Sequence, residues 1–98
     1  MKYIESLKEG ERISEVYICR SKSILMTKTG KEYASIVLAD KTGQLDGKIW
    51  DLNSGGIDDF EALDYVHATG LITLYNGSFQ FKIERIRVAQ ESEYVASD

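Results

Sequence analysis

The stretch that most constrains the fold is residues 33–51, YASIVLADKTGQLDGKIWD, which has the pattern of two β-strands joined by a tight turn. In the first strand Ile36 and Leu38 share one face, and the other face carries Tyr33, Ser35, Val37 and Ala39. The turn is residues 40–43, in which Gly43 is expected to supply a positive φ. The apolar pair predicts a core face.

The second strand continues the alternation. Leu45, Gly47 and Ile49 point one way, and Asp46, Lys48 and Trp50 point the other. The hairpin therefore has one packed face and one partly polar face bearing two large aromatics, Tyr33 and Trp50. Such a face suits a ligand platform, but an ordinary half-exposed sheet has the same pattern.

The rest of the chain supplies three more predicted strands. Residues 12–28 are rich in β-branched side chains and too long for one straight strand. Because Ile13 and Val16 are out of phase, a bulge or bend is expected between them. Residues 65–75 and 78–88 form a second hairpin around Asn76-Gly77, a turn in which both positions tolerate positive φ.

The sequence also predicts which residues of these last two strands face inward and where the strands bend. Val66 and Ala68 are expected to face inward, and Gly70 permits a bend. In the final strand Phe79, Phe81 and Ile83 alternate, after which the phase slips to Ile86 and Val88. Residues 1–90 are predicted to form one domain, and the acidic residues 91–98 a tail or the start of a linker.

One short helix is predicted between the third and fourth strands, in residues 53–63. Asn53 or Ser54 can cap it, and Asp58 and Asp59 suit its positive N-terminal end. An apolar stripe at a spacing of three residues comprises Ile57, Phe60 and Leu63. The aspartates are interpreted as helix-start residues rather than as a metal pair.

The element order, three strands, a short helix and two strands, predicts an all-β, five-stranded Greek-key barrel of the OB type. The chain also resembles the N-terminal OB-fold domain of YhaM-type 3′–5′ exoribonucleases and, more loosely, the anticodon-binding OB domains of aminoacyl-tRNA synthetases. The motifs that carry the resemblance are GKEY at 30–33, LADKTG at 38–43 and KIWD at 48–51, and similarity extends from MKYI at 1–4 to IERIR at 83–87. The resemblance implies a metal-dependent HD-type hydrolase domain after the OB domain, and these 98 residues contain none of it.

Composition sets further bounds. The chain has 98 residues, a formal charge of −4 and one cysteine. That charge argues against a strong grip on a phosphate backbone irrespective of sequence. No apolar run is long enough to span a bilayer, no signal peptide is evident, and an unpaired Cys19 fits a reducing cytoplasm.

Catalysis finds little support in the sequence. His67 is expected on the solvent side of a strand, and Cys19 as a small buried thiol. There is no Ser/His/Asp set, zinc-ligand spacing, phosphate loop or dinucleotide fingerprint. The chain by itself is interpreted as a non-enzyme, with no cofactor and no metal.

Nucleic-acid binding finds more support. OB barrels bind oligonucleotides across strands 2 and 3 and the loops joining strands 1–2 and 4–5. Side chains predicted to lie there are Tyr33, Ser35, Lys48 and Trp50 on the hairpin, Arg20 and Lys22 late in strand 1, Lys28 and Lys31 in the first loop, and Tyr75 and Asn76 at the second. Aromatic side chains can stack on unpaired bases, and lysines can bind phosphates. The predicted partner is therefore single-stranded nucleic acid, with RNA preferred to DNA as the prediction.

A second class of function stays open. The acidic balance and the small side chains of Ser35, Val37 and Ala39 favour a protein-interaction or oligomerisation module that keeps the barrel without the nucleic-acid site. Salt dependence separates the two classes, because phosphate contacts weaken steeply with salt and an apolar interface responds weakly.

Overall fold

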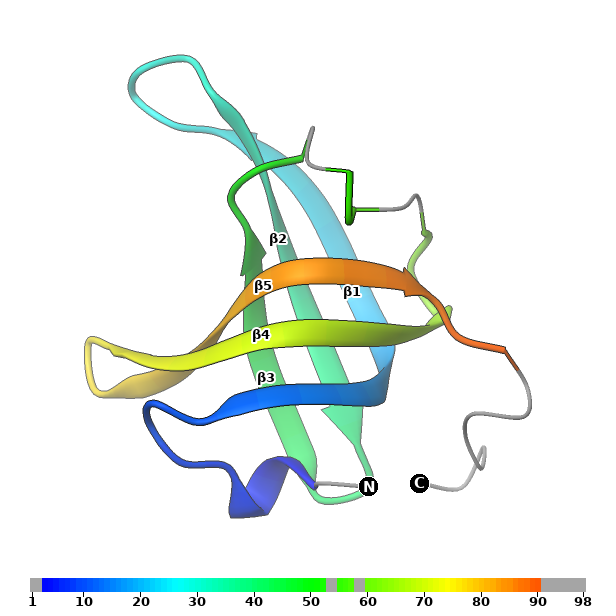
Figure 1. Cartoon of the computed structure of the whole chain (residues 1–98). Coiled ribbons are helices and arrows are strands. Elements are labelled where there is room, and N and C mark those ends of the chain that lie inside the picture. Colours follow the sequence, from blue (N-terminus) through cyan, green and yellow to red (C-terminus); the bar gives the residue numbers. More distant parts are fainter. Residues whose placement is uncertain (1–2, 53–54, 58–59, 91–98) are drawn as a thin grey trace.

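The computed structural model describes residues 3–52, 55–57 and 60–90, which form a closed five-stranded barrel (Figure 1). The elements are η1 (Ile4–Ser6), β1 (Arg12–Met26), β2 (Glu32–Asp40), β3 (Gly43–Ile49), β4 (Tyr65–Tyr75) and β5 (Ser78–Val88). Around the barrel the order is β1-β2-β3-β5-β4, with β4 closing on β1. All pairs are antiparallel except β3–β5, which is parallel. The predicted all-β OB-type barrel is confirmed.

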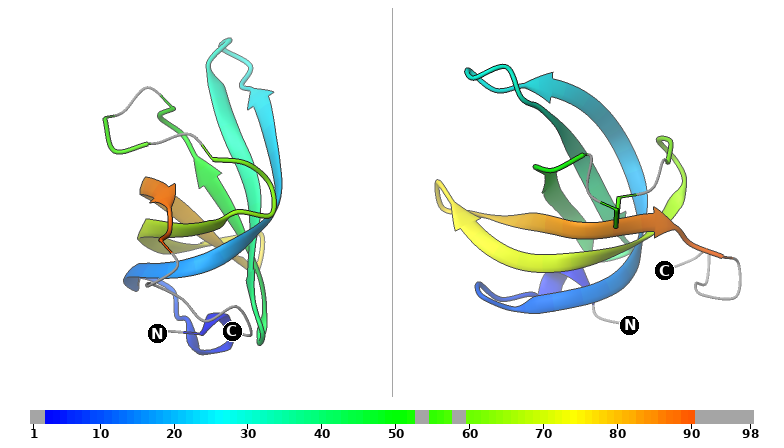
Figure 2. Two further views of the ribbon diagram at one scale, coloured as in Figure 1. Left: turned by 90° about the vertical axis from the view of Figure 1, so that its right-hand side faces the viewer. Right: turned by 45° about the horizontal axis from the view of Figure 1, so that its top comes forward.

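The long first strand bends, as predicted, and so belongs to both sides of the barrel (Figure 2). It pairs with β4 from Arg12 to Ile18 and with β2 from Ile18 to Met26. The bulge lies at Arg20, where the register shifts between Cys19 and Ser21, and the predicted position between residues 13 and 16 is wrong. Val16 faces away from the core and is nevertheless buried. Its apolar side chain is therefore no sign of a change of phase between residues 13 and 16.

The core confirms the predicted phases of the central hairpin and of most of the second one, in which Phe79 and Val88, near the ends of β5, are 40% and 45% exposed. Ile36 and Leu38 of β2 are fully buried, and Leu45 and Ile49 of β3 lie beside them. The same cluster includes Val66, Ala68 and Ile72 of β4 and Phe81, Ile83 and Ile86 of β5. The slip in β5 is real, because Thr69 pairs with Arg85 whereas Gly70 pairs with Ile83, which leaves Glu84 as the extra residue of a bulge.

The helix predicted between β3 and β4 is wrong for the part of it that the structure describes. Residues 55–57 and 60–63 there form turns and an isolated bridge between Ile57 and Ile86. Some of their backbone groups bond to the barrel: Leu63 N donates to Cys19 O, and Gly56 O accepts from Ile86 N. Two successive glycines, at 55 and 56, also weaken any helix. Asn53, Ser54, Asp58 and Asp59 lie outside the described residues.

The members of the predicted apolar stripe separate accordingly. Phe60 is buried, but Leu63 adopts a positive φ of 77° and is 67% exposed. The short helix that does form is η1, a 3-10 turn near the N-terminus. Among the described residues no helix is long and apolar enough to cross a membrane. The predicted tail, 91–98, lies outside those residues, so the domain boundary at 90 stays a prediction.

The turn between β2 and β3 is organised by Asp40 rather than by Gly43. One oxygen of the Asp40 carboxylate accepts from the backbone N–H and the hydroxyl of Thr42, at 2.7 and 2.6 Å, and the other accepts from Ile4 N at 2.8 Å. The expected positive φ at Gly43 is wrong, since the glycines that adopt one in the described chain are Gly10, Gly30 and Gly77. The aspartate of the LADKTG motif therefore ties the N-terminal turn η1 to the central hairpin.

Candidate nucleic-acid interface

The two aromatics predicted on the central hairpin do meet on its outer face. The ring centroids of Tyr33 and Trp50 are 4.7 Å apart and the planes are inclined by 32°. Tyr33 is half-buried, whereas the Trp50 side chain, just after β3, is 39% exposed. This tilted contact, with the centroids within the usual range of aromatic pairs, is favourable and helps to hold the exposed indole in place on the surface.

The centre of the same face carries a neutral ion pair, Lys48 with Asp46. Lys48 Nζ donates to Ser35 Oγ at 2.9 Å and to both carboxylate oxygens of Asp46, at 3.0 and 2.9 Å. Three contacts use the three ammonium protons of Lys48, and Asp46 balances its charge. Lys48 and Ser35 thus come together as predicted, but Lys48 is already engaged within the protein.

The β1–β2 hairpin carries charge that is not balanced in this way. Thr27 N donates to Lys31 O at 2.8 Å, and Gly30, with a φ of 88°, donates to Thr27 O at 3.0 Å. This compact turn exposes Lys28 and Lys31, and neither has an ion-pair partner within residues 3–52, 55–57 and 60–90. Both lysines are therefore available to a phosphate.

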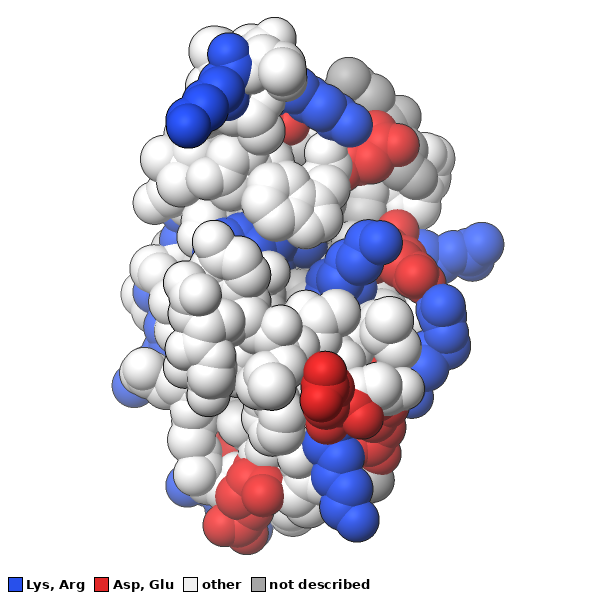
Figure 3. Space-filling view, turned by 90° about the vertical axis from the view of Figure 1, so that its left-hand side faces the viewer, with Lys and Arg blue, Asp and Glu red and all other residues white. Residues whose placement is uncertain are grey.

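The β4–β5 hairpin has the predicted turn. Asn76 and Gly77 both have positive φ, 52° and 81°, and Tyr75 is 64% exposed. Both hairpins project from the same side of the barrel (Figure 1). Figure 3 views that side: lysine or arginine side chains stand at its upper end, a large uncharged area extends down its middle, and side chains of both charges lie to the right of that area and below it. The β4–β5 hairpin, with Tyr75 and Asn76, and the β1–β2 hairpin, with Lys28 and Lys31, therefore project on one side of the barrel (Figure 1).

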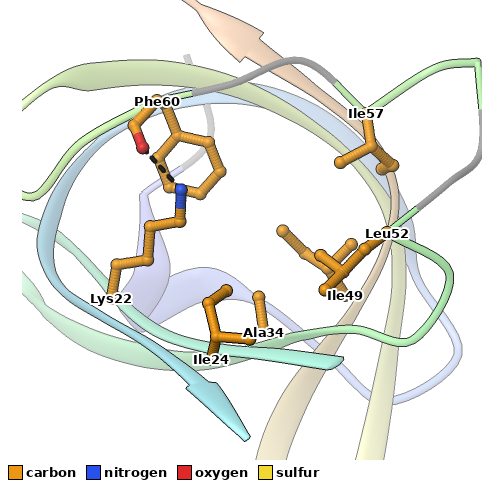
Figure 4. A pocket seen from close by; sticks show the side chains of 7 residues that line it. All are labelled: Lys22, Ile24, Ala34, Ile49, Leu52, Ile57 and Phe60. Atoms are coloured by element: carbon orange, nitrogen blue, oxygen red, sulfur yellow. Dashed lines mark hydrogen bonds between the residues drawn. The ribbon is translucent and has the colours of Figure 1, made fainter. Parts of the chain in front are cut away.

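Lys22 does not join the interface. It pairs with inward-facing Ile36 in the β-sheet register, because the bulge at Arg20 reverses the phase of β1 beyond it. Lys22 Nζ donates to Phe60 O at 2.6 Å and lies 4.3 Å from the centre of the Phe60 ring (Figure 4). The lysine thereby holds the segment between β3 and β4 across one end of the barrel. Arg20 itself is exposed at the bulge.

The structure adds three side chains that the sequence did not suggest. Leu25, 45% exposed, pairs with Tyr33 across β1 and β2, and Lys82 aligns with Lys48 through the parallel β3–β5 pairing. Phe79, 40% exposed, projects beside Leu74 at the β4–β5 hairpin. The sequence shows that the β4–β5 hairpin carries aromatic side chains. The position of Lys82, however, depends on a parallel β3–β5 pairing that no local sequence pattern predicts.

Residues with catalytic potential are inert or absent from this face. Burial raises the pKa of Cys19, which opposes formation of the reactive thiolate, and its side chain is fully buried. No group of three or more metal-ligating side chains occurs in the described part of the chain. What this face offers a ligand is the exposed Trp50 ring for stacking and the charges of Lys28 and Lys31.

Asp46→Asn is expected to strengthen binding of a single strand by roughly three- to tenfold. The change removes a carboxylate from the centre of the face and frees the Lys48 ammonium, which adds up to ~0.7 to the salt slope for one new phosphate contact. The pair is only partly exposed, with side-chain exposures of 15% for Lys48 and 46% for Asp46, and its loss is expected to cost ~1 kcal/mol of stability. Fluorescence anisotropy at several salt concentrations measures both quantities.

Glu61→Gln is the matched control, because it changes the net charge equally at an exposed position in the segment between β3 and β4. An equal gain in both variants would attribute the effect to net charge alone. No gain in Asp46→Asn would mean that Lys48 takes no part in binding.

No protein-family model matches the chain, but searches with its sequence and its structure find similar proteins. It is 32% identical over 88 residues to the 3′–5′ exoribonuclease YhaM of Listeria monocytogenes serotype 4b, and 28% identical over 89 residues to that of Bacillus velezensis. These alignments cover 90% and 91% of this chain but only 28% of each relative, so the chain spans less than a third of their length.

Solved structures with the same fold come from other proteins. A domain of replication protein A from Methanococcus maripaludis superposes with a TM-score of 0.75 at 16% identity, covering 93% of this chain and 97% of that one. A replication protein A heterotrimer bound to single-stranded DNA gives 0.66 at 17% identity, over 90% and 64%. At these identities the likeness establishes the fold. The chain is an OB-fold domain homologous to one part of the YhaM-type 3′–5′ exoribonucleases.

Proposed function

We propose that this chain is a single-stranded nucleic-acid-binding module, with RNA as its natural partner, that serves as the substrate-binding part of a larger exonuclease. The observation that carries the proposal is the Tyr33–Trp50 pair, which holds an exposed indole on the outer face of β2 and β3. An unpaired base exposes its faces for stacking, whereas a paired base hides them, so single strands bind in preference to duplex.

The two hairpins complete the proposed site. Lys28 and Lys31 of the β1–β2 hairpin supply phosphate contacts, and Tyr75 and Asn76 of the β4–β5 hairpin contact the bound nucleic acid. Because Lys48 is neutralised by Asp46, stacking contributes more of the affinity than charge does. A modest affinity is therefore expected, in keeping with a chain of net charge −4.

The relatives support this assignment. Proteins named 3′–5′ exoribonuclease align with this chain, at 28% and 32% identity, over about 28% of their length, which leaves room in them for a separate catalytic domain. A following nuclease domain and a cytoplasmic location belong to the proposal. In that setting the barrel holds the single-stranded substrate, and the catalytic groups are contributed from elsewhere.

A protein-interaction module is the second candidate, and exposed apolar side chains on both hairpins favour it. Leu25, Met26 and Leu74 are 45%, 64% and 49% exposed. Such side chains also accompany stacked bases, so salt dependence discriminates: an apolar protein interface responds weakly to salt, whereas phosphate contacts weaken steeply.

Trp50→Ala is expected to weaken single-strand binding by ~1–3 kcal/mol, because it removes the stacking surface, and to leave the salt slope nearly unchanged. Lys28→Ala or Lys31→Ala should instead lower the salt slope by up to ~0.7 for each lost phosphate contact. Titrations with a short single-stranded RNA at several salt concentrations give both signatures.

Trp50→Phe is the control, since it keeps an aromatic face and should retain most of the affinity. Unaltered affinity in Trp50→Ala, with an intact fold, would remove Trp50 from the site. A loss of binding in the lysine variants without any change in salt slope would count against phosphate contacts at that hairpin.

A further inference from the structure

A second polar cluster occupies the opposite side of the barrel from Tyr33 and Trp50. Its members are outward-facing residues of β1, β4 and β5: Ser14, His67, Thr69, Arg85 and Arg87. They stand in two adjacent cross-strand rows, Ser14–Thr69–Arg85 and Val16–His67–Arg87. β4, β5 and the first half of β1 lie on one side in the edge-on view of Figure 2, with β2 and β3 on the other.

Short polar contacts connect four of these side chains. Arg87 Nη2 lies 3.2 Å from Nδ1 of His67, and Nε2 of His67 lies 2.6 Å from Ser14 Oγ. Ser14 Oγ in turn lies 2.9 Å from Thr69 Oγ1. These contacts hold the Thr69 hydroxyl in place beside the two arginines.

A surface hollow of about 310 Å³ lies over this cluster. Among the described residues its lining is Gly56, His67, Thr69, Arg85, Ile86 and Arg87, and these six include no carboxylate, although acidic residues outnumber basic ones in the chain. The exposed Arg85 has no ion-pair partner in the described part of the chain. By contrast, Arg12 on the same three strands is paired with both carboxylate oxygens of Glu84.

Gly56 shapes the hollow by having no side chain. A Cβ at this position would lie 2.8 Å from Cγ of Arg85, so the bare glycine lets the arginine stem lie against the segment before β4. Gly56 O also accepts from Ile86 N at 3.0 Å, which secures that segment to β5. Arg85 is thus held by packing at the rim while its head remains exposed.

We infer that this hollow binds a phosphate group through Arg85 and Thr69. A guanidinium group and a hydroxyl match the acceptor oxygens of a tetrahedral oxyanion, and arginine binds phosphate with two parallel hydrogen bonds. The site is separate from the β2–β3 face and does not depend on single-strand binding there. Its phosphate comes either from a free phosphate or monoester, or from a phosphodiester of a strand that continues around the barrel.

Amide NMR shifts measured during titration with potassium phosphate, against potassium chloride at equal ionic strength, test the inference. Saturating shifts at millimolar phosphate are expected at Gly56, His67, Thr69 and Arg85. Arg85→Gln should weaken phosphate binding about tenfold or more, as the loss of charged hydrogen bonds does, and Thr69→Val several-fold. Arg12→Gln, with the same charge change, should leave it unaltered.

An oligonucleotide without terminal phosphates identifies the source. Shifts at the same four amides assign a phosphodiester, whereas shifts confined to β2 and β3 assign a free phosphate or monoester. The inference is overturned if phosphate gives only the shifts that chloride gives, or if a folded Arg85→Gln protein binds phosphate as well as wild type.

Discussion

Gly70→Ala is expected to destabilise the barrel by at least ~3 kcal/mol, at or beyond the upper end of the usual cost of overpacking. An added Cβ would overlap the backbone oxygen of Lys82 and would lie 2.9 Å from the Phe81 ring. A backbone carbonyl cannot swing aside as a flexible side chain does, so the β4–β5 pairing next to the bulge at Glu84 must open. Urea denaturation followed by circular dichroism measures the loss.

Gly43→Ala provides the contrast, since a Cβ there meets only Ile4 Cγ2 at 3.8 Å and its φ is not positive. That substitution should be neutral or slightly stabilising, because alanine reduces the freedom of the unfolded chain. Similar stabilities for the two variants would show that β5 does not pass so close to Gly70.

Leu38→Ala should cost ~2–5 kcal/mol, the range for truncating a fully buried leucine. Leu38 pairs with Leu45 across β2 and β3 inside the barrel and has no exposed surface. Val37→Ala is the matched variant on the preceding residue, where the side chain points outward and is only partly buried. It should cost much less, and chemical denaturation of both proteins gives the difference.

Equal losses in these two variants would mean that β2 has the opposite phase. The outer face that carries Tyr33 and Ser35 would then be the core face, and the proposed interface would disappear with it. The pair of variants therefore tests the geometry on which the binding site depends as well as the stability of the barrel.

The sequence predicted this geometry well wherever one face of a strand is buried and the other is exposed. In the central hairpin the alternating apolar residues Ile36, Leu38, Leu45 and Ile49 are all buried, as their spacing requires. The position of the aromatic pair on the outer face followed from the same alternation. The turn at residues 76–77 was predictable because its chemistry is local.

Features that depend on distant contacts were not predictable. The bulge at Arg20 reversed the phase of Lys22 and took it from the interface to Phe60. The segment after β3 has apolar residues at helical spacing, yet its backbone bonds to β1 and β5 instead. The cluster around His67 likewise arises only when β1, β4 and β5 are brought together.

The central claim, that an exposed indole on the outer face of β2 and β3 stacks on unpaired bases, is tested most directly by the fluorescence of Trp50. It is the only tryptophan of the chain and is 39% exposed, so its emission reports on that one position. Titration with a single-stranded RNA should change the emission and saturate, and a duplex of the same length should bind more weakly. Emission that stays unchanged while an anisotropy probe shows saturated binding, or a duplex bound as tightly as the single strand, would contradict the claim.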